Sequence, residues 1–235
     1  SHKLGFHMLG EFALVGGEEF RQGCETMDKA IMGASGRTPA RVVVIPTAAI
    51  TGPTKAANDG VAYFANLGAN SSPLMILDAN QADDERLIKD LDKNDVIYFT
   101  GGSPIHLLSV LKGSRLLTGI LEAVSKGTVL AGSSAGAMVL GSLMRLPPAE
   151  DWGEALGVVQ GIGVLPHHEK RDPAKVSRLL ENQVPLSFTV FGIDARTGCL
   201  GKPGSWRVVG SGNVTVYRNA TWTIYHPGEK LPSTI

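Results

Sequence analysis

The sequence has little cysteine, no excess charge of either sign and no long hydrophobic run. Its 235 residues include two cysteines, Cys24 and Cys199, which are too few for a disulfide scaffold and lack metal-site spacing. Basic and acidic residues number 22 each, so the chain lacks the basic footprint of a nucleic-acid-binding protein. No stretch approaches the roughly 20 apolar residues of a membrane span. We therefore expect no nucleic-acid or membrane partner, no metal and no cofactor.

The first residues predict no secretion. Ser1-His2-Lys3 resembles a cloning remnant, and no apolar core long enough for a signal peptide precedes Val15. We expect a cytoplasmic protein, unless an N-terminal signal peptide was removed. The length predicts a single domain, 1–235, with a tag or disordered start at 1–11, an α/β core in 12–205, and antiparallel strands and a tail in 206–235.

Strands alternate with helices over the first 145 residues, a pattern typical of βαβ units. The strands are almost continuously apolar, which indicates a mostly parallel sheet flanked by helices on both faces. In such a sheet, ligands bind beyond the carboxyl ends of the strands. We expect strands at 12–15, 41–45, 73–77, 95–99 and 129–131, and helices at 18–32, 55–67, 83–91, 104–111 and 116–125.

Beyond residue 145 the pattern changes. The polar, proline-rich residues 146–154 predict a loop, and Asp172 followed by Pro173 predicts the start of a helix. The exposed strands at the end of the chain would also allow a homodimer. We expect strands at 158–165 and 188–193, a helix at 173–182, and a small antiparallel C-terminal extension from Trp206 onward.

One stretch carries a motif for nucleophilic catalysis. Gly132-Ser133-Ser134-Ala135-Gly136 fits G-x-S-x-G and joins a predicted strand to a helical pattern without a spacer, as a nucleophile elbow requires. The turn would strain Ser134, expose its hydroxyl at the carboxyl edge of the sheet and need very small residues two positions away. An ordinary glycine- and serine-rich turn is the alternative, and the missing spacer favours the nucleophile.

A serine nucleophile needs a base, and the adjacent pair His167-His168 is the best candidate among six histidines. The pair follows Pro166 on a loop between a predicted strand and a predicted helix. Adjacent side chains on extended backbone point in opposite directions, so only one of the two can serve. His106 opens a helix, where capping or packing is the commoner role.

The other parts of such a site are a pair of oxyanion donors and an acid that orients the histidine. The amide of Ala135 follows the nucleophile, and the amide of Gly102 follows the neighbouring strand. A plain strand-to-helix turn explains Gly101-Gly102 equally well. The residues alone do not choose among five carboxylates for the acid, which are Glu150, Asp151, Glu154, Glu169 and Asp194.

Five short motifs occur along the chain in a particular order. They are Val15-Gly16-Gly17-Glu18, Phe99-Thr100-Gly101-Gly102, Gly132-Ser133-Ser134-Ala135-Gly136-Ala137, Pro166-His167-His168 and Gly192-Ile193-Asp194. Over residues 12–217 this ordered set resembles the cyanophycinase and dipeptidase E family of serine peptidases. The resemblance implies a class I glutamine-amidotransferase-like fold, which is a flavodoxin-like three-layer α/β architecture. It also implies Ser134 as nucleophile and His167 as general base, with His168 as the fallback.

Two departures from the family pattern bear on the substrate. Cyanophycinases carry Gly-Ile-Asp-Glu where this chain has Gly192-Ile193-Asp194-Ala195, and their arginine spacing after the histidine is matched only in part, by Arg171 and Arg178. We expect a hydrolase of short peptides, Asp-containing or isoaspartyl, in which Asp194 and Glu150 rank level as the orienting acid. Further substrate contacts are expected at Gly17, Trp152, His168 and Arg171.

Two alternatives stand beside this hypothesis. His167-x-Glu169 mimics the H-x-E pair of amidotransferase-like members of the fold, although those usually carry a cysteine at the elbow and neither cysteine here is placed to replace Ser134. The second alternative is a small-molecule-binding protein that keeps the elbow only as structure.

Overall fold

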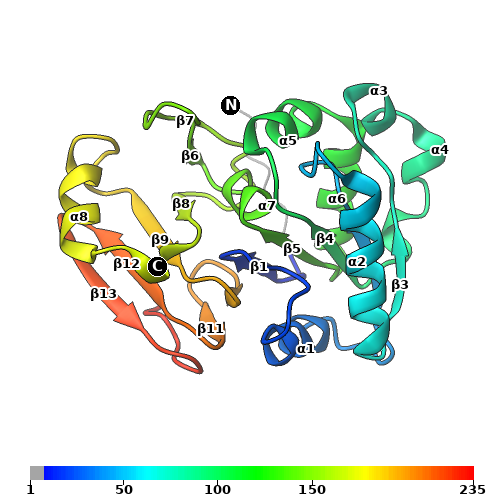
Figure 1. Cartoon of the computed structure of the whole chain (residues 1–235), viewed down its shortest axis with the longest axis horizontal. Helices are drawn as coiled ribbons and strands as arrows, with labels where there is room; N and C mark the ends of the chain where they lie inside the picture. Colours follow the sequence, from blue (N-terminus) through cyan, green and yellow to red (C-terminus); the bar gives the residue numbers. More distant parts are fainter. Residues whose placement is uncertain (1–7) are drawn as a thin grey trace.

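A seven-stranded sheet crosses the centre of the computed structural model, which describes residues 8–235 (Figure 1). Its strand order is β11-β10-β1-β5-β4-β2-β3, and five of these strands run parallel while β10 and β11 run antiparallel at one edge. The predicted mostly parallel sheet is confirmed. The strands are β1 (Phe12–Val15), β2 (Arg41–Ile45), β3 (Asn70–Pro73), β4 (Val96–Phe99), β5 (Val129–Ser133), β10 (Thr197–Gly201) and β11 (Arg207–Gly210).

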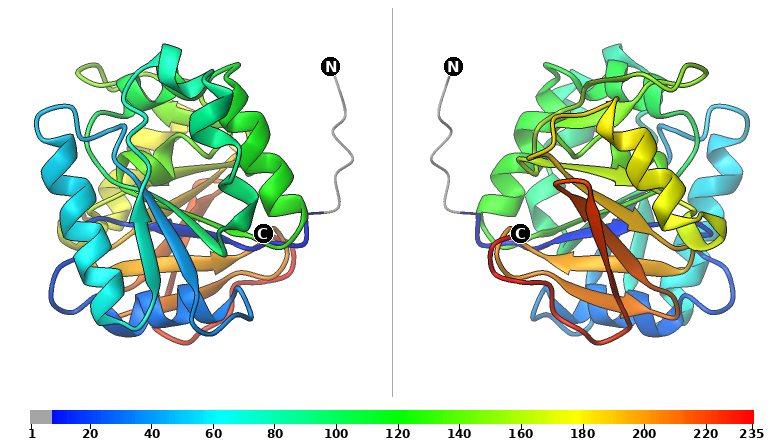
Figure 2. Two further views of the ribbon diagram at one scale, coloured as in Figure 1. Left: turned by 90° about the vertical axis from the view of Figure 1, so that its right-hand side faces the viewer. Right: turned by 90° about the vertical axis from the view of Figure 1, so that its left-hand side faces the viewer.

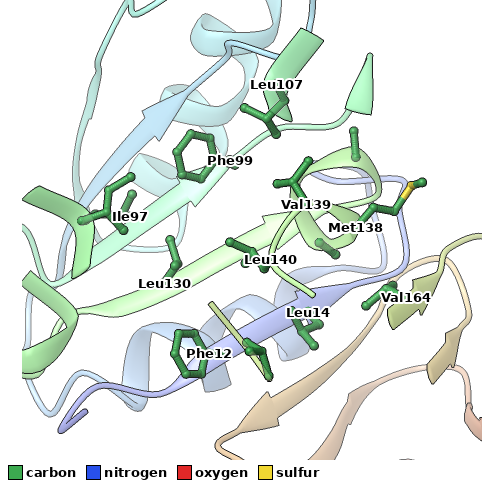
Figure 3. Packing of buried hydrophobic residues seen from close by; sticks show 14 of the residues in the cluster. Phe12, Leu14, Ile97, Phe99, Leu107, Leu130, Met138, Val139, Leu140 and Val164 are labelled. Carbon is green, nitrogen blue, oxygen red and sulfur yellow. The ribbon is translucent and has the colours of Figure 1, made fainter. Parts of the chain in front are cut away.

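Helices cover both faces of this sheet. Successive residues of a strand point to opposite sides, so each strand packs against the helices of both faces. Phe12 and Leu14 belong to the apolar cluster under α5, α6 and α7, whereas Ala13 and Val15 belong to the one under α1 and α2. Figure 3 shows the first cluster, in which Leu107 of α5 lies above Phe99 of β4. The helices are α1 (Glu25–Gly33), α2 (Pro53–Asn66), α3 (Ala79–Ala82), α4 (Glu85–Ile88), η1 (Leu91–Lys93), α5 (Pro104–Leu111), α6 (Arg115–Ser125) and α7 (Ala135–Met138).

The second half of the chain forms another sheet, of order β13-β12-β9-β8, beside a two-stranded hairpin of β6 and β7. Helix α8 lies against this sheet (Figure 2, right). Its Val176 and Leu180 pack against Val190 and Tyr217 of the sheet. The elements are β6 (Leu143–Arg145), β7 (Trp152–Glu154), β8 (Ile162–Leu165), η2 (His168–Lys170), α8 (Pro173–Glu181), β9 (Thr189–Ile193), β12 (Val214–Arg218) and β13 (Thr221–Tyr225).

The antiparallel extension expected from Trp206 onward is divided between the two sheets. Strand β11 continues the central sheet next to β10, whereas β12 pairs with β9 and carries β13 at the edge of the second sheet. The chain changes sheets just after Gly210, whose φ of 109° favours glycine and lets the backbone turn away. The tag or disordered start expected at 1–11 falls largely on residues 1–7. These residues, which include His2 and His7, lie outside the described part of the chain.

Several element boundaries differ from the predictions for physical reasons. The helix expected at 18–32 begins at Glu25, because Glu18 and Phe20 have φ angles of 59° and 67°, which an α-helix does not allow. The strand expected at 73–77 lies earlier in the chain: the edge strand β3 shares only Pro73 with it, because the chain then leaves the sheet edge and buries Ile76 in the core. Strand β10 was not expected, because its short sequence Thr-Gly-Cys-Leu-Gly shows no periodicity.

Other local predictions are confirmed. Helix α5 has the predicted bounds, and the Asp172 side chain caps α8 by accepting a hydrogen bond from the amide of Ala174 at 3.0 Å.

Two other segments differ from the predictions. The helix expected at 83–91 is broken into α4 and η1, and the loop expected at 146–154 ends in β7. In residues 8–235, no helix is both long and apolar enough to cross a bilayer.

Candidate active site

Ser134 occupies a strained turn between β5 and α7. Its φ and ψ are 53° and −109°, and its amide donates a hydrogen bond to the carbonyl of Val15 at 2.9 Å. A non-glycine residue at positive φ typically costs 1–3 kcal/mol, so the surrounding structure must hold it there. The predicted context of strand, sharp turn and helix is confirmed.

The two glycines of the motif leave room for this turn. A Cβ atom on Gly132 would lie 2.3 Å from the carbonyl oxygen of Gly136, and one on Gly136 would lie 2.8 Å from the carbonyl oxygen of Phe99. Both distances are below van der Waals contact with backbone atoms that cannot move aside. Glycine is therefore required at both positions by close packing.

An open pocket of about 260 Å³ lies at the carboxyl edge of the central sheet, beside Ser134. It brings together three of the residues predicted from the sequence, Gly102, Ser134 and His167, which come from separate segments of the chain. Its full lining is Glu18, Glu19, Arg21, Gly101, Gly102, Ser134 and His167.

His167 is held at the pocket by its own backbone and by Gly17. Its φ is 50°, and its amide donates to the carbonyl of Gly16 at 2.8 Å. The imidazole lies directly over Gly17, where a Cβ would stand 2.1 Å from Cε1 of the ring. Gly17, a predicted substrate contact, thus lets the ring approach the end of β1.

His168 points into the protein. It is only 3% exposed, its ring lies against Gly192, and its Nε2 is 2.6 Å from the hydroxyl of Tyr217. Burial, assisted by the charge of Arg171, lowers the pKa of His168 to about 4. Of the adjacent pair, His167 lines the pocket that Ser134 also lines, and His168 lies in the packing between η2 and the second sheet.

None of the candidate acids lines this pocket. Asp194 follows β9, is partly buried, and accepts a hydrogen bond from the amide of Asn213 at 2.9 Å, while burial raises its pKa. Glu169 accepts from the amide of Ala195 at 2.9 Å, and Glu150 is exposed in the loop between β6 and β7. Within residues 8–235, no carboxylate makes a hydrogen bond with the imidazole of His167.

Two other predicted substrate contacts, Trp152 and Arg171, do not line this pocket. The indole of Trp152 donates to Gln183 at 3.2 Å and packs edge-on against Phe188, with 6.3 Å between ring centroids. Trp152 therefore anchors the β6–β7 hairpin to the segment after α8. Arg171 is exposed at the end of η2.

Glu19 is one of the pocket residues that sequence reasoning missed, together with Glu18 and Arg21. One carboxylate oxygen, Oε1, accepts the amide of Gly101 at 2.8 Å, and the other, Oε2, accepts the hydroxyl of Ser133 at 2.7 Å. Its sequence position suggests the first turn of a surface helix, which hides this role. The one available signal is the pair Gly16-Gly17 at the end of β1, which marks a tight loop at the functional edge.

The sequence is similar to those of known proteins. The family model for Peptidase family S51 matches residues 12–197. A cyanophycinase of Geminocystis herdmanii (strain PCC 6308) is 27% identical over 223 residues, which cover 89% of this chain and 81% of that protein. A cyanophycinase of Trichormus variabilis (strain ATCC 29413 / PCC 7937) is 25% identical over 216 residues, which cover 86% and 72% respectively.

Two solved structures are also similar. A peptidase from an acI-B1 Actinobacterium superposes with a TM-score of 0.83 at 27% identity and covers 97% of this chain and 98% of its own. A putative peptidase E protein from Listeria monocytogenes EGD-e shares the fold, with a TM-score of 0.57 at 18% identity, over 89% of this chain and 98% of its own. The family resemblance predicted from the five motifs is confirmed. The chain therefore belongs to peptidase family S51 and is a serine-type peptidase.

Proposed function

We propose that Ser134 is the nucleophile, that His167 is its general base, and that the amides of Gly102 and Ala135 form the oxyanion hole. The observation that carries this proposal is the meeting of the strained Ser134 turn and His167 in one open pocket. A strained nucleophile held beside a histidine is the arrangement that serine acyl transfer needs.

The reaction follows from these roles. Ser134 Oγ attacks the carbonyl carbon of the scissile bond while His167 takes the hydroxyl proton. The carbon–nitrogen bond then breaks as His167 returns that proton to the leaving amine, which leaves an acyl-enzyme on Ser134. Water, deprotonated by His167, attacks the ester carbonyl. The bond between the acyl carbon and Ser134 Oγ breaks, His167 returns the proton to Oγ, and the acid is released.

The oxyanion hole is supported by the hydrogen bonding of the backbone around the pocket. The amides of Gly102 and Ala135 donate to no acceptor in the part of the chain that the structure describes. The amide of Gly101 is bound by Glu19, so Gly102 is the free donor of that turn. Gly102 has a φ of 141° and a Cβ there would lie 2.0 Å from the carbonyl oxygen of Ala48, so the turn depends on glycine.

Of the two acids that ranked level from the sequence, we retain Asp194. Its backbone lies against Gly16, where a Cβ would meet the carbonyl oxygen of Asp194 at 2.0 Å, and Gly16 in turn accepts the amide of His167. Asp194 thus belongs to the edge that carries the base. Glu150 is exposed, and water screens the charge of an exposed carboxylate.

The substrates we propose are short peptides that contain aspartate, including isoaspartyl peptides. Support comes from the relatives named cyanophycinase and from an open pocket whose size suits a few residues. The pocket carries charges of both signs, on Glu18, Glu19 and Arg21, which suits a charged peptide better than an apolar one.

Labelling with a fluorophosphonate tests the catalytic assignment. The wild-type protein should take up one label per chain and Ser134→Ala none, and hydrolysis by Ser134→Ala and His167→Ala should each fall by several orders of magnitude with folding retained. His168→Gln is the matched control, because its side chain lies outside the pocket. Near-normal turnover by His167→Ala, or labelling of Ser134→Ala, would contradict the assignment. A dipeptide library that compares Asp-X, isoaspartyl-X and Ala-X tests the substrate, and preference for Ala-X would refute it.

A further inference from the structure

Glu19 ties together two segments that border the pocket. Its carboxylate accepts the amide of Gly101 at 2.8 Å and the hydroxyl of Ser133 at 2.7 Å. Gly101 directly precedes Gly102, and Ser133 directly precedes Ser134. One side chain therefore spans both walls of the proposed oxyanion hole, and hydrogen bonds to an ionised acceptor are the stronger kind.

The loop that carries Glu19 has an unusual backbone. Glu18 and Phe20, its two neighbours, have φ angles of 59° and 67°, in the left-handed region that non-glycine residues seldom adopt. Such a conformation is strained and persists only where packing holds it. The carbonyl of Glu18 is held by the thiol of Cys24 at 3.2 Å, and the side chain of Phe20 supplies the larger anchor.

Phe20 packs into an aromatic cluster formed by α2 and β4. Its ring centroid lies 5.7, 5.9 and 5.3 Å from those of Tyr63, Phe64 and Tyr98. The ring also lies over Gly60 in the middle of α2, where a Cβ would stand 2.8 Å from Cζ of Phe20. The same Cβ would stand 2.9 Å from Cγ1 of Val44, so room for the Phe20 ring and for Val44 accounts for a glycine inside a helix, where alanine is otherwise favoured.

We propose that Glu19 is a positioning residue for the oxyanion hole, held in place by the packing of Phe20 on Gly60. This inference rests on the proposed function, because it needs Gly102 and Ala135 to be the oxyanion donors. Both oxygens of Glu19 are occupied by Gly101 and Ser133, so Glu19 acts on the reaction through the backbone that it orients.

The consequence is a catalytic effect of a side chain that does not itself contact the reacting atoms. Loss of the Glu19 contacts would let the turn at Gly102 move relative to Ala135, and a misplacement of about 1 Å can lower a rate by about 10²-fold. The donors contribute most in the transition state, so kcat should change and KM should not. A larger side chain at Gly60 would have the same effect by displacing Phe20.

The test compares Glu19→Ala and Glu19→Gln with the wild type. One measurement gives the rate constant and the final extent of fluorophosphonate labelling. The other gives kcat and KM for the dipeptide that the wild type cleaves best. The phosphoryl oxygen of the reagent occupies the oxyanion hole, so its reaction rate reports on that hole. Glu19→Ala should slow labelling and kcat by about 10- to 100-fold, with KM nearly unchanged and one label per chain at the end. Glu19→Gln should recover most of the rate, because its amide can accept from Gly101 and donate to Ser133.

A pair of helix glycines separates positioning from a general loss of stability. Gly60→Ala and Gly119→Ala both replace a glycine inside a helix, but a Cβ at Gly119 would meet only Leu91 Cδ2 at an ordinary 3.4 Å. Gly60→Ala should lower kcat by about 3- to 10-fold even where its Tm is unchanged, and Gly119→Ala should leave kcat as in the wild type. Equal kcat values for the two variants would refute the part played by Phe20.

Other outcomes overturn the main claim. A kcat for Glu19→Ala within about twofold of the wild type, or a loss confined to KM, would show that Glu19 does not position the hole. Should Glu19→Ala fail to fold, Ser133→Ala removes one of the two contacts and must then lower kcat. Failure of the proposed function itself would appear separately, as labelling or hydrolysis that survives in Ser134→Ala.

Discussion

Asp28, a fully buried carboxyl in α1, makes the protein less stable as the pH rises through neutrality. One of its oxygens, Oδ2, accepts the hydroxyl of Tyr63 at 2.6 Å, and Oδ1 has no hydrogen-bond partner among residues 8–235. Burial, with smaller contributions from the charges of Glu25 and Glu19, raises the pKa of Asp28 to about 7, against the opposing effect of the Tyr63 hydrogen bond.

The size and sign of the effect follow from linkage. An aspartate in the unfolded chain has a pKa of about 3.9, so between about pH 4 and pH 7 the folded state keeps a proton that the unfolded state has lost. The stabilisation due to protonated Asp28 is present in full below about pH 4 and is lost as the pH rises through 7. The difference between a pKa of about 7 and the unfolded value corresponds to roughly 4 kcal/mol.

Asp28→Asn isolates this contribution, because asparagine keeps an acceptor for the hydroxyl of Tyr63 and cannot ionise. Urea unfolding of both proteins should show nearly equal free energies of unfolding at about pH 4, and a variant more stable by several kcal/mol at about pH 8. The difference between the two proteins is the quantity to compare, since other groups titrate equally in both. A difference that stays constant from pH 4 to pH 8 would refute the reasoning and show that Asp28 is ionised throughout.

Two further predictions concern the edge that carries the pocket. Burial lowers the pKa of His168 to about 4, so the stabilisation due to neutral His168 is present above about pH 6.5 and is lost as the pH falls toward 4, by about 3 kcal/mol. In urea unfolding, His168→Gln should lack this loss. A free energy of unfolding that falls equally with pH in the variant and the wild type would contradict the prediction. For the orienting acid, Asp194→Asn should lower kcat by tenfold or more while Glu150→Gln stays near the wild type, and the reverse order in steady-state kinetics would assign the role to Glu150.

The sequence by itself determined the features that depend on short-range patterns. The alternation of apolar strands and helices predicts the parallel sheet, because each element must bury one face against its neighbours. The spacing of Gly132 and Gly136 around Ser134 predicts the elbow, because only glycine allows the backbone to pass so closely.

The tertiary structure alone decided how separate segments meet. The choice of His167 over His168 depends on which ring lies over Gly17 and which lies against Gly192, and both glycines are remote in sequence. From the sequence, Glu19 is expected at the start of a surface helix. The packing of Phe20 on α2 places it instead in a loop at the pocket. These outcomes depend on long-range packing that holds residues at positive φ against their local preference, and no local pattern in the sequence records it.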